Sequence, residues 1–259
     1  MSQADCFSIM LLLKKYLFVI LTGMIFIISC SDDDGGVLPK DILELEASYR
    51  IDVLEPSGLA VSGSGNVLYT VSDNTAEIYK LSTTGDVIQT FNYKGNDLEG
   101  VSTFTGNNLL LAEERTKEIV VFDMSSGTYS KHRINYKNND ENSGIEGVAY
   151  NSTDGTIFIL NEKNPGKLIR LRDDFSIIAE YELNFASDYS GIFYDSSSNS
   201  LWIVSDQNKT INKCTLTGEL VKAYSISVTQ AEGIAIANDK IFVVSDAEAK
   251  LYIFLKPIN

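Results

Sequence analysis

Two sets of polar residues recur along the chain at spacings that could bring them together around one axis. The first set stands directly before a glycine and comprises Ser57, Glu99, Glu146, Ser190 and Glu232. The second set ends an apolar run further on and comprises Asp73, Glu114, Glu162, Asp206 and Asp246. Carboxylate and hydroxyl oxygens, without histidine or thiolate, suit the hard cations Ca²⁺ and Mg²⁺. The chemistry that these residues could do is therefore oxygen-only cation binding.

The first set gives the sharper hypothesis, because it varies between serine and glutamate as a specialised site would. If its positions converge on a channel, the carboxylates of Glu99, Glu146 and Glu232 approach one another and stay ionised only when a cation or hydrogen-bond donors compensate. We predict a divalent cation held by these three glutamates, calcium ahead of magnesium. The alternative is that residues at this position hydrogen-bond to the backbone of the neighbouring repeat.

The second set has a carboxylate in every copy, which favours a structural duty in each repeat. Asp and Glu at strand ends often cap the following turn through backbone N–H groups. We therefore expect turn capping there, with channel binding as the alternative. Arg115, next to Glu114, is expected to form a local ion pair or to reach an anionic ligand near the channel.

No catalytic set is evident, and no catalytic residue is assigned. The chain has one histidine, His132, and one histidine cannot establish a triad or a zinc site with the three cysteines. Cys214 lies at an apolar strand position and is expected to be an inert core residue.

The elements that position these sets are repeats. The five glycines that follow the first set are 42, 47, 44 and 42 residues apart, and they are Gly58, Gly100, Gly147, Gly191 and Gly233. Each repeat carries about four strand signals, which predicts an all-β fold, a β-propeller with five blades of four antiparallel strands. The fifth copy is short, so a strand within 44–54 is predicted to complete it and close the ring. The alternative is a six-bladed ring with a degenerate blade in 127–143.

The N-terminus reads as a targeting segment. Lys14 and Lys15 precede a short apolar run over 16–28, and Cys30 follows. This order resembles a bacterial lipobox, which implies cleavage before Cys30 and lipid attachment to it; a plain signal anchor is the alternative. The predicted domains are a lipoprotein signal peptide (1–29), a lipidated Cys with a flexible acidic tether (30–43) and a single propeller (44–259).

Composition restricts the partners. The net charge is −14 at pH 7, which argues against binding to a nucleic-acid backbone. We expect a monomer that is attached to the membrane through its lipid anchor and that meets a protein, peptide or glycan of the cell envelope.

Several repeat motifs resemble those of the SdiA-regulated family of β-propeller proteins. They are Ser57-Gly58-Leu59-Ala60-Val61, Leu98-Glu99-Gly100-Val101, Ile145-Glu146-Gly147-Val148-Ala149 and Ala231-Glu232-Gly233-Ile234-Ala235, with the strand ends Thr70-Val71-Ser72-Asp73, Leu111-Ala112-Glu113-Glu114 and Ile203-Val204-Ser205-Asp206. NHL-repeat and gluconolactonase-like propellers share much of this pattern. The resemblance implies an envelope propeller, and the acidic tract after Cys30 resembles that of outer-membrane lipoproteins, periplasmic or surface-exposed. Gluconolactonase-like hydrolases hold a divalent cation at the channel mouth with a mixed Glu/Asn/Asp set, which this sequence does not match.

Two functions follow as hypotheses. The first is a lipid-anchored binding or scaffold propeller with a divalent cation in its channel. The second is a metal-dependent hydrolase of esters or lactones, in which a cation held by Glu99, Glu146 and Glu232 would polarise a carbonyl or activate water.

Overall fold

The computed structural model describes residues 41–138 and 143–258. The chain divides into two units, Met1–Leu38 and Pro39–Asn259, and the described residues all lie in the second. The predicted signal peptide, Cys30 and most of the tether lie outside the described residues. No helix in the described segments has the length and hydropathy to cross a membrane.

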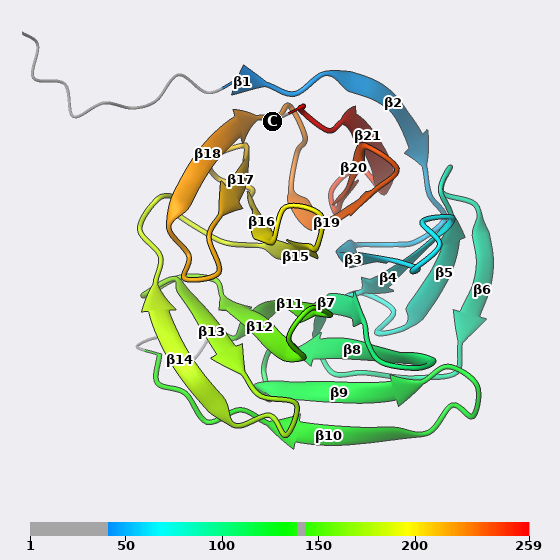
Figure 1. Ribbon diagram of the computed structural model, residues 1–259. Helices are drawn as coiled ribbons and strands as arrows, with labels where there is room; N and C mark the ends of the chain where they lie inside the picture. Colours follow the sequence, from blue (N-terminus) through cyan, green and yellow to red (C-terminus); the bar gives the residue numbers. More distant parts are fainter. Residues whose placement is uncertain (1–40, 139–142, 259) are drawn as a thin grey trace, which may run out of the picture. The chain divides into compact units, whose positions relative to one another are not determined.

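The second unit is a five-bladed β-propeller, as the sequence predicted, with its blades arranged around a central axis (Figure 1). Blade 1 comprises β3 (Pro56–Val61), β4 (Val67–Ser72), β5 (Ile78–Ser82) and β6 (Val87–Phe91). Blade 2 comprises β7 (Leu98–Thr103), β8 (Asn108–Glu113), β9 (Glu118–Asp123) and β10 (Tyr129–Arg133). Blade 3 comprises β11 (Ile145–Asn151), β12 (Thr156–Asn161), β13 (Lys167–Leu171) and β14 (Ile177–Glu182). Blade 4 comprises β15 (Gly191–Asp195), β16 (Ser200–Ser205), β17 (Thr210–Cys214) and β18 (Leu220–Ser225).

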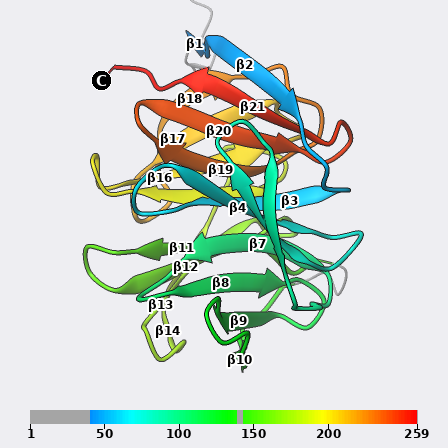
Figure 2. The ribbon, with the colours of Figure 1, turned by 90° about the vertical axis from the view of Figure 1, so that its right-hand side faces the viewer.

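Blade 5 is built from both ends of the described chain. It comprises β19 (Ala231–Ala237), β20 (Lys240–Ser245), β21 (Lys250–Leu255) and β2 (Leu45–Arg50). β2 pairs antiparallel with β21 as the outer strand, which confirms the predicted closure (Figure 2). This pairing removes the open edge that β21 would otherwise present.

Two details complete the blades. The segment proposed as a possible sixth blade supplies β10, the outer strand of blade 2, so the six-bladed alternative is wrong. A short strand that the sequence did not predict, β1 (Asp41–Ile42), pairs in parallel with β18, and Lys222 forms an ion pair with Asp41. The chain therefore crosses the outer edge of blade 4 before it closes blade 5.

The hydrophobic core lies between neighbouring blades in five clusters, because each sheet buries residues on both faces. The fully buried Trp202 stacks on Tyr224 at 5.7 Å between ring centroids. Cys214 is also fully buried, and burial raises the pKa of its thiol to about 12, so it stays protonated. It is the inert core residue that its strand position indicated.

The five inner strands meet at a ring of glycines, which we call the waist: Gly58, Gly100, Gly147, Gly191 and Gly233. A Cβ added at Gly233 would lie 2.6 Å from the carbonyl carbon of Gly58, and one at Gly58 would lie 2.8 Å from the Cα of Gly100. Four of the five inner strands carry a register shift at this step. Glycine is therefore needed for the close approach of neighbouring backbones near the axis.

The waist generates a stability prediction. Gly233→Ala should lower the free energy of unfolding by about 1–3 kcal/mol, because the new methyl group overlaps backbone atoms that cannot move without shifting blade 1. Chemical denaturation measures the change. Gly63→Ala is the matched control, since a Cβ there meets nothing within 4 Å, and equal stability of the two variants would contradict the close packing at the waist.

Candidate functional site

The first set lies around one end of the channel, which we call the acidic mouth and define by the first and second sets together. Ser57, Glu99, Glu146 and Glu232 lie on the inner strands β3, β7, β11 and β19, and Ser190 directly precedes β15. Figure 1 shows these strands innermost in their blades. The fold therefore gathers residues that are more than 40 positions apart in the sequence.

The two serines of the first set bond to the next blade. Ser57 Oγ donates to Glu99 Oε2 at 2.7 Å, and Ser190 Oγ donates to the carbonyl oxygen of Ala231 at 2.7 Å. The alternative stated for this set, bonding to the neighbouring backbone, is therefore right for Ser190. Ser57 instead fixes one oxygen of a channel carboxyl.

The three glutamates form an electrostatically strained group. Burial raises the pKa of Glu99 and of Glu146 well above the ordinary value, and charges on neighbouring carboxyls add to the shift in both. Burial and then the charges of Asp206 and Asp246 raise the pKa of Glu232 to about 8. Each side chain keeps part of its surface open to the channel. At neutral pH such a group must hold protons or a compensating cation.

The second set begins the turn after the second strand of each blade. Glu114 Oε1 accepts the amide N–H of Gly144 at 2.9 Å, and Asp206 Oδ1 accepts that of Ala231 at 3.2 Å. These contacts join blade 2 to blade 3 and blade 4 to blade 5. Glu114 and Asp206 thus connect neighbouring blades, where capping of their own turns was expected.

Turn capping falls one residue earlier, at positions that the sequence reasoning missed. Ser72, Ser205 and Ser245 each accept the amide N–H three residues later, at 2.9, 3.2 and 3.3 Å. All five equivalent residues are buried and polar: Ser72, Glu113, Asn161, Ser205 and Ser245. A polar residue recurs at this position in all five repeats, which could have indicated its role. Capping was instead assigned to the carboxylate that follows it.

The carboxylates of the second set differ in whether a nearby cation compensates their negative charge. Glu162 pairs with Lys163 at 2.6 Å, and Asp206 pairs with Lys209 at 2.6 Å. Asp246 Oδ1 is buried and has no hydrogen-bond partner among the described residues, and burial raises the pKa of Asp246. The mouth is therefore well compensated at blade 4 and less so at blade 5.

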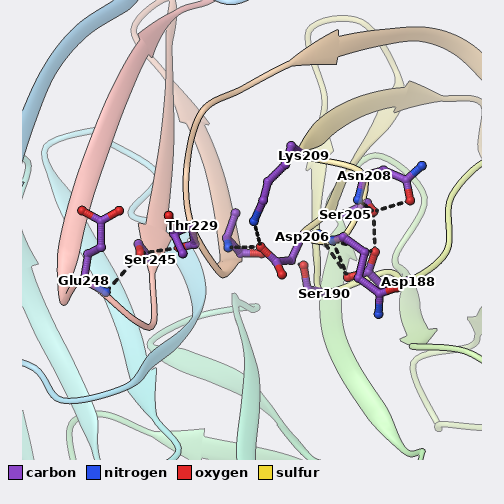
Figure 3. A network of polar contacts seen from close by, with 11 residues as sticks. Asp188, Ser190, Ser205, Asp206, Asn208, Lys209, Thr229, Ser245 and Glu248 are labelled. Atoms are coloured by element: carbon purple, nitrogen blue, oxygen red, sulfur yellow. Dashed lines mark hydrogen bonds and ion pairs between the residues drawn. The ribbon is translucent and has the colours of Figure 1, made fainter.

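A third set, also missed, lies two residues before the first and comprises Glu55, Asp97, Gly144, Asp188 and Gln230. The carbonyl oxygens of Glu55, Asp97 and Gln230 accept the N–H of the second-set residue in the same blade. Asp188 is buried and accepts hydrogen bonds from the hydroxyl of Ser205 and from the N–H of Asp206, as Figure 3 shows. In blade 4 this position is purely structural.

In blade 2 the same position completes a compact acidic group. Oxygens of Asp73, Asp97 and Glu99 lie within 4.8 Å of one another, so this group within the described residues has the spacing of metal ligands. The Asp97 side chain is only 7% exposed, and Arg115 Nε lies 2.6 Å from its Oδ2. Burial and then a hydrogen bond with Asp97 raise the pKa of Asp73 to about 6. Arg115 thus forms an ion pair, as one of its two predicted roles required, but its partner is Asp97 and not a carboxylate of its own turn.

The donor set fits a calcium-sized cation. Ligands at 2.3–2.6 Å from one ion lie at most about 5 Å apart, which the three carboxyls satisfy. Only Glu99 is shared with the predicted trio, and the prediction that Glu146 and Glu232 complete a site with it stays a prediction. What the structure brings together is one first-set glutamate with two aspartates at the boundary of blades 1 and 2.

Solved structures with a similar fold include enzymes. Glutaminyl cyclase from Myxococcus xanthus aligns with a TM-score of 0.65 at 11% identity, over 85% of this chain and 99% of that chain. A gluconolactonase from Xanthomonas campestris aligns with a TM-score of 0.57 at 11% identity, over 83% and 92%. Virginiamycin B lyase from Staphylococcus aureus aligns with a TM-score of 0.50 at 19% identity, over 82% and 74%. At these identities the likeness establishes the propeller fold and no activity.

The family is established by the sequence and not by the likeness to solved structures. The SdiA-regulated family matches residues 44–256, which is nearly the whole propeller and includes every repeat motif on which the resemblance was based. The chain belongs to the SdiA-regulated family.

Proposed function

We propose that the protein is a binding propeller of the bacterial cell envelope whose acidic mouth holds a divalent cation, Ca²⁺ ahead of Mg²⁺. The observation that carries the proposal is the group of Asp73, Asp97 and Glu99, three buried or half-buried carboxyls with the spacing of ligands to one ion. Their mutual repulsion is offset by one exposed arginine, Arg115. A bound cation would offset it further and would join blades 1 and 2.

The unsatisfied carboxylate of Asp246 gives independent support. A buried carboxyl oxygen without a partner costs free energy, and such groups are uncommon unless an ion or water completes them. The described mouth therefore has more acceptor capacity than the protein's own donors use. In the proposed role the cation holds the mouth in one conformation, and the surrounding loops contact a protein, peptide or glycan.

We also propose that Cys30 carries the lipid that attaches the propeller to the outer membrane, on its periplasmic or outer surface. The support is the order of Lys14, Lys15, the apolar run 16–28 and Cys30. The acidic residues after Cys30 would then separate the propeller from the bilayer.

A second candidate is a metal-dependent hydrolase. The observation that favours it is Glu232, a channel carboxyl whose pKa burial raises to about 8 in the metal-free protein, so that it holds at neutral pH a proton that it can donate. A cation at the same mouth would polarise an ester or lactone carbonyl. Calcium-dependent turnover that is lost in Glu232→Gln would establish this candidate, and a panel of esters and lactones without turnover would favour the binding role.

The cation proposal predicts saturable binding of Ca²⁺ to residues Pro39–Asn259 in calorimetry, with a higher melting temperature in its presence. Asp97→Asn should weaken binding at least tenfold, because it removes the charge of a ligand whose side chain is only 7% exposed. Asp174→Asn, on the exposed β13–β14 turn, is the control and should bind as the wild type does. Equal affinity in the two variants, or no binding to the wild type, would contradict the site.

The raised pKa of Glu232 predicts a pH dependence of stability. In metal-free protein the folded state keeps this proton up to about pH 8, whereas the unfolded chain releases it near pH 4.5. The free energy of unfolding should therefore fall as pH rises through this window, by at most about 1.4 kcal/mol per pH unit from this group. The groups that face Glu232 are Asp206, Asp246, Asp188 and Glu162.

Glu232→Gln tests this dependence, because it removes the titrating group and keeps the shape. Denaturation at several pH values with a chelator present should give a flatter curve than that of the wild type. Glu182→Gln, an exposed residue of β14, should leave the slope unchanged. Parallel curves for wild type and Glu232→Gln would show that Glu232 ionises normally.

The anchor predicts a change of location. Cys30→Ser should abolish incorporation of labelled fatty acid and reduce the protein in the outer-membrane fraction. Cys214→Ser is the control, since Cys214 is buried and cannot be acylated in the folded protein. Unchanged labelling in Cys30→Ser would contradict lipid attachment there.

A further inference from the structure

The channel has a second feature beyond the waist. A cavity of about 450 Å³, which we call the far cavity, is lined by residues that follow the glycines in all five blades. Its lining begins at Leu59, Val101, Ala149, Ile192 and Ile236 and contains no residue of the three polar sets. Because the waist residues lie between these positions and the acidic sets in every inner strand, the far cavity and the acidic mouth are separate sites.

The far cavity is lined by one aromatic side chain at a position where the other four blades have small residues. Two residues after the waist glycine, four blades carry small side chains: Ala60, Ser102, Ala149 and Ala235. Blade 4 carries Phe193, which lines the cavity and is half-buried. It packs against the cluster between blades 4 and 5 and also against the cluster between blades 5 and 1, and the second of these clusters does not border blade 4. No aromatic ring of the described segments stacks on Phe193.

The wall of the far cavity is rich in hydroxyl groups. Ser62, Ser64, Ser152 and Ser196 come from three different blades. Tyr150 is held edge-on by Phe104 at 4.8 Å between ring centroids, and its hydroxyl has no hydrogen-bond partner among residues 41–138 and 143–258. Several donors and acceptors are thus available to a molecule that enters.

The cavity is not built for an anion. The cation in its described lining is Lys256, and Lys256 Nζ is already paired with Asp195 Oδ2 at 2.7 Å. The two side chains are 13% and 7% exposed, and Nζ also donates to Ser197 Oγ at 3.2 Å. This buried pair fixes the tail after β21 to blade 4 and leaves no uncompensated positive charge for a ligand.

We propose that the far cavity binds a neutral polyhydroxylated ligand, a saccharide unit whose apolar C–H face packs on Phe193. Its hydroxyls would bond with Tyr150 and the serines of the wall. The volume is within the range of small-ligand sites, and an aromatic surface with a few convergent polar groups is the usual composition of such sites. The inference does not depend on the cation at the acidic mouth.

The experiment is a binding titration of the purified full chain, in a detergent without a sugar headgroup and with a chelator present. The probes are glucose, galactose, N-acetylglucosamine and the β-1,4-linked disaccharide of glucose and of N-acetylglucosamine, followed by saturation-transfer NMR and calorimetry. We expect saturable binding of at least one probe, weakened at least tenfold in Phe193→Ala and at least threefold in Tyr150→Phe.

The variants are chosen so that a folding defect cannot imitate the result. Alanine or serine already occupies the position of Phe193 in four blades, and Tyr150→Phe deletes one hydroxyl and keeps the ring on Phe104. Tyr129→Phe, an exposed residue of β10, is the matched control and should bind as the wild type does. Binding of none of the probes, or equal binding by the wild type and both cavity variants, would overturn the proposal. Because the chelator removes Ca²⁺, failure here is distinguishable from failure of the cation site.

Discussion

The close approach of five inner strands at the waist is the constraint on which the other features depend. Each waist glycine lies against the inner strand of the next blade, and at Gly58 the backbone has a positive φ of 33°. A side chain at these positions would push neighbouring blades apart. Five blades of ordinary size can therefore close tightly, with hydrophobic clusters between every neighbouring pair.

The waist also separates two parts of the channel that differ in the chemical character of their side chains. Residues directly before the glycines are glutamates and serines, and they meet carboxyls from the adjacent turns at the acidic mouth. Residues after the glycines are mostly apolar, small or hydroxylated, and they line the far cavity together with Asp239 and the Asp195–Lys256 ion pair. One repeated backbone step thus places an acidic group and a polar cavity on the same axis, where substitutions in single blades can specialise either one.

The strands, the blade number and the closure by residues near 44–54 could be predicted from the sequence, because glycine spacing and alternating apolar residues are local signals that the fold repeats five times. β1 could not, because two residues paired in parallel leave no periodic pattern. The first and second sets were also visible, since they align with the glycines.

The composition of the acidic group was harder to predict. Asp97 lies two residues before Glu99, where the other blades carry Glu55, Gly144, Asp188 and Gln230. The residue types at this position do not indicate that Asp188 accepts hydrogen bonds from backbone N–H groups, whereas Asp97 faces Asp73 of another blade. Such differences arise from contacts between blades. Aligning the repeats of one sequence with one another gives no information about these contacts. The hydrogen bonds of Asp206 and Glu114 to the following blade could not be predicted either, because they too are contacts between blades.

The central claim is that Asp73, Asp97 and Glu99 form a cation site at the acidic mouth. The most direct measurement is anomalous diffraction from crystals of the propeller grown with Ca²⁺. We expect an anomalous peak within about 2.6 Å of an oxygen of each of these three carboxyls. Electron density that shows the carboxyls in direct contact with one another, with no peak between them at saturating Ca²⁺, would contradict it and would make the acidic mouth a group held together by shared protons.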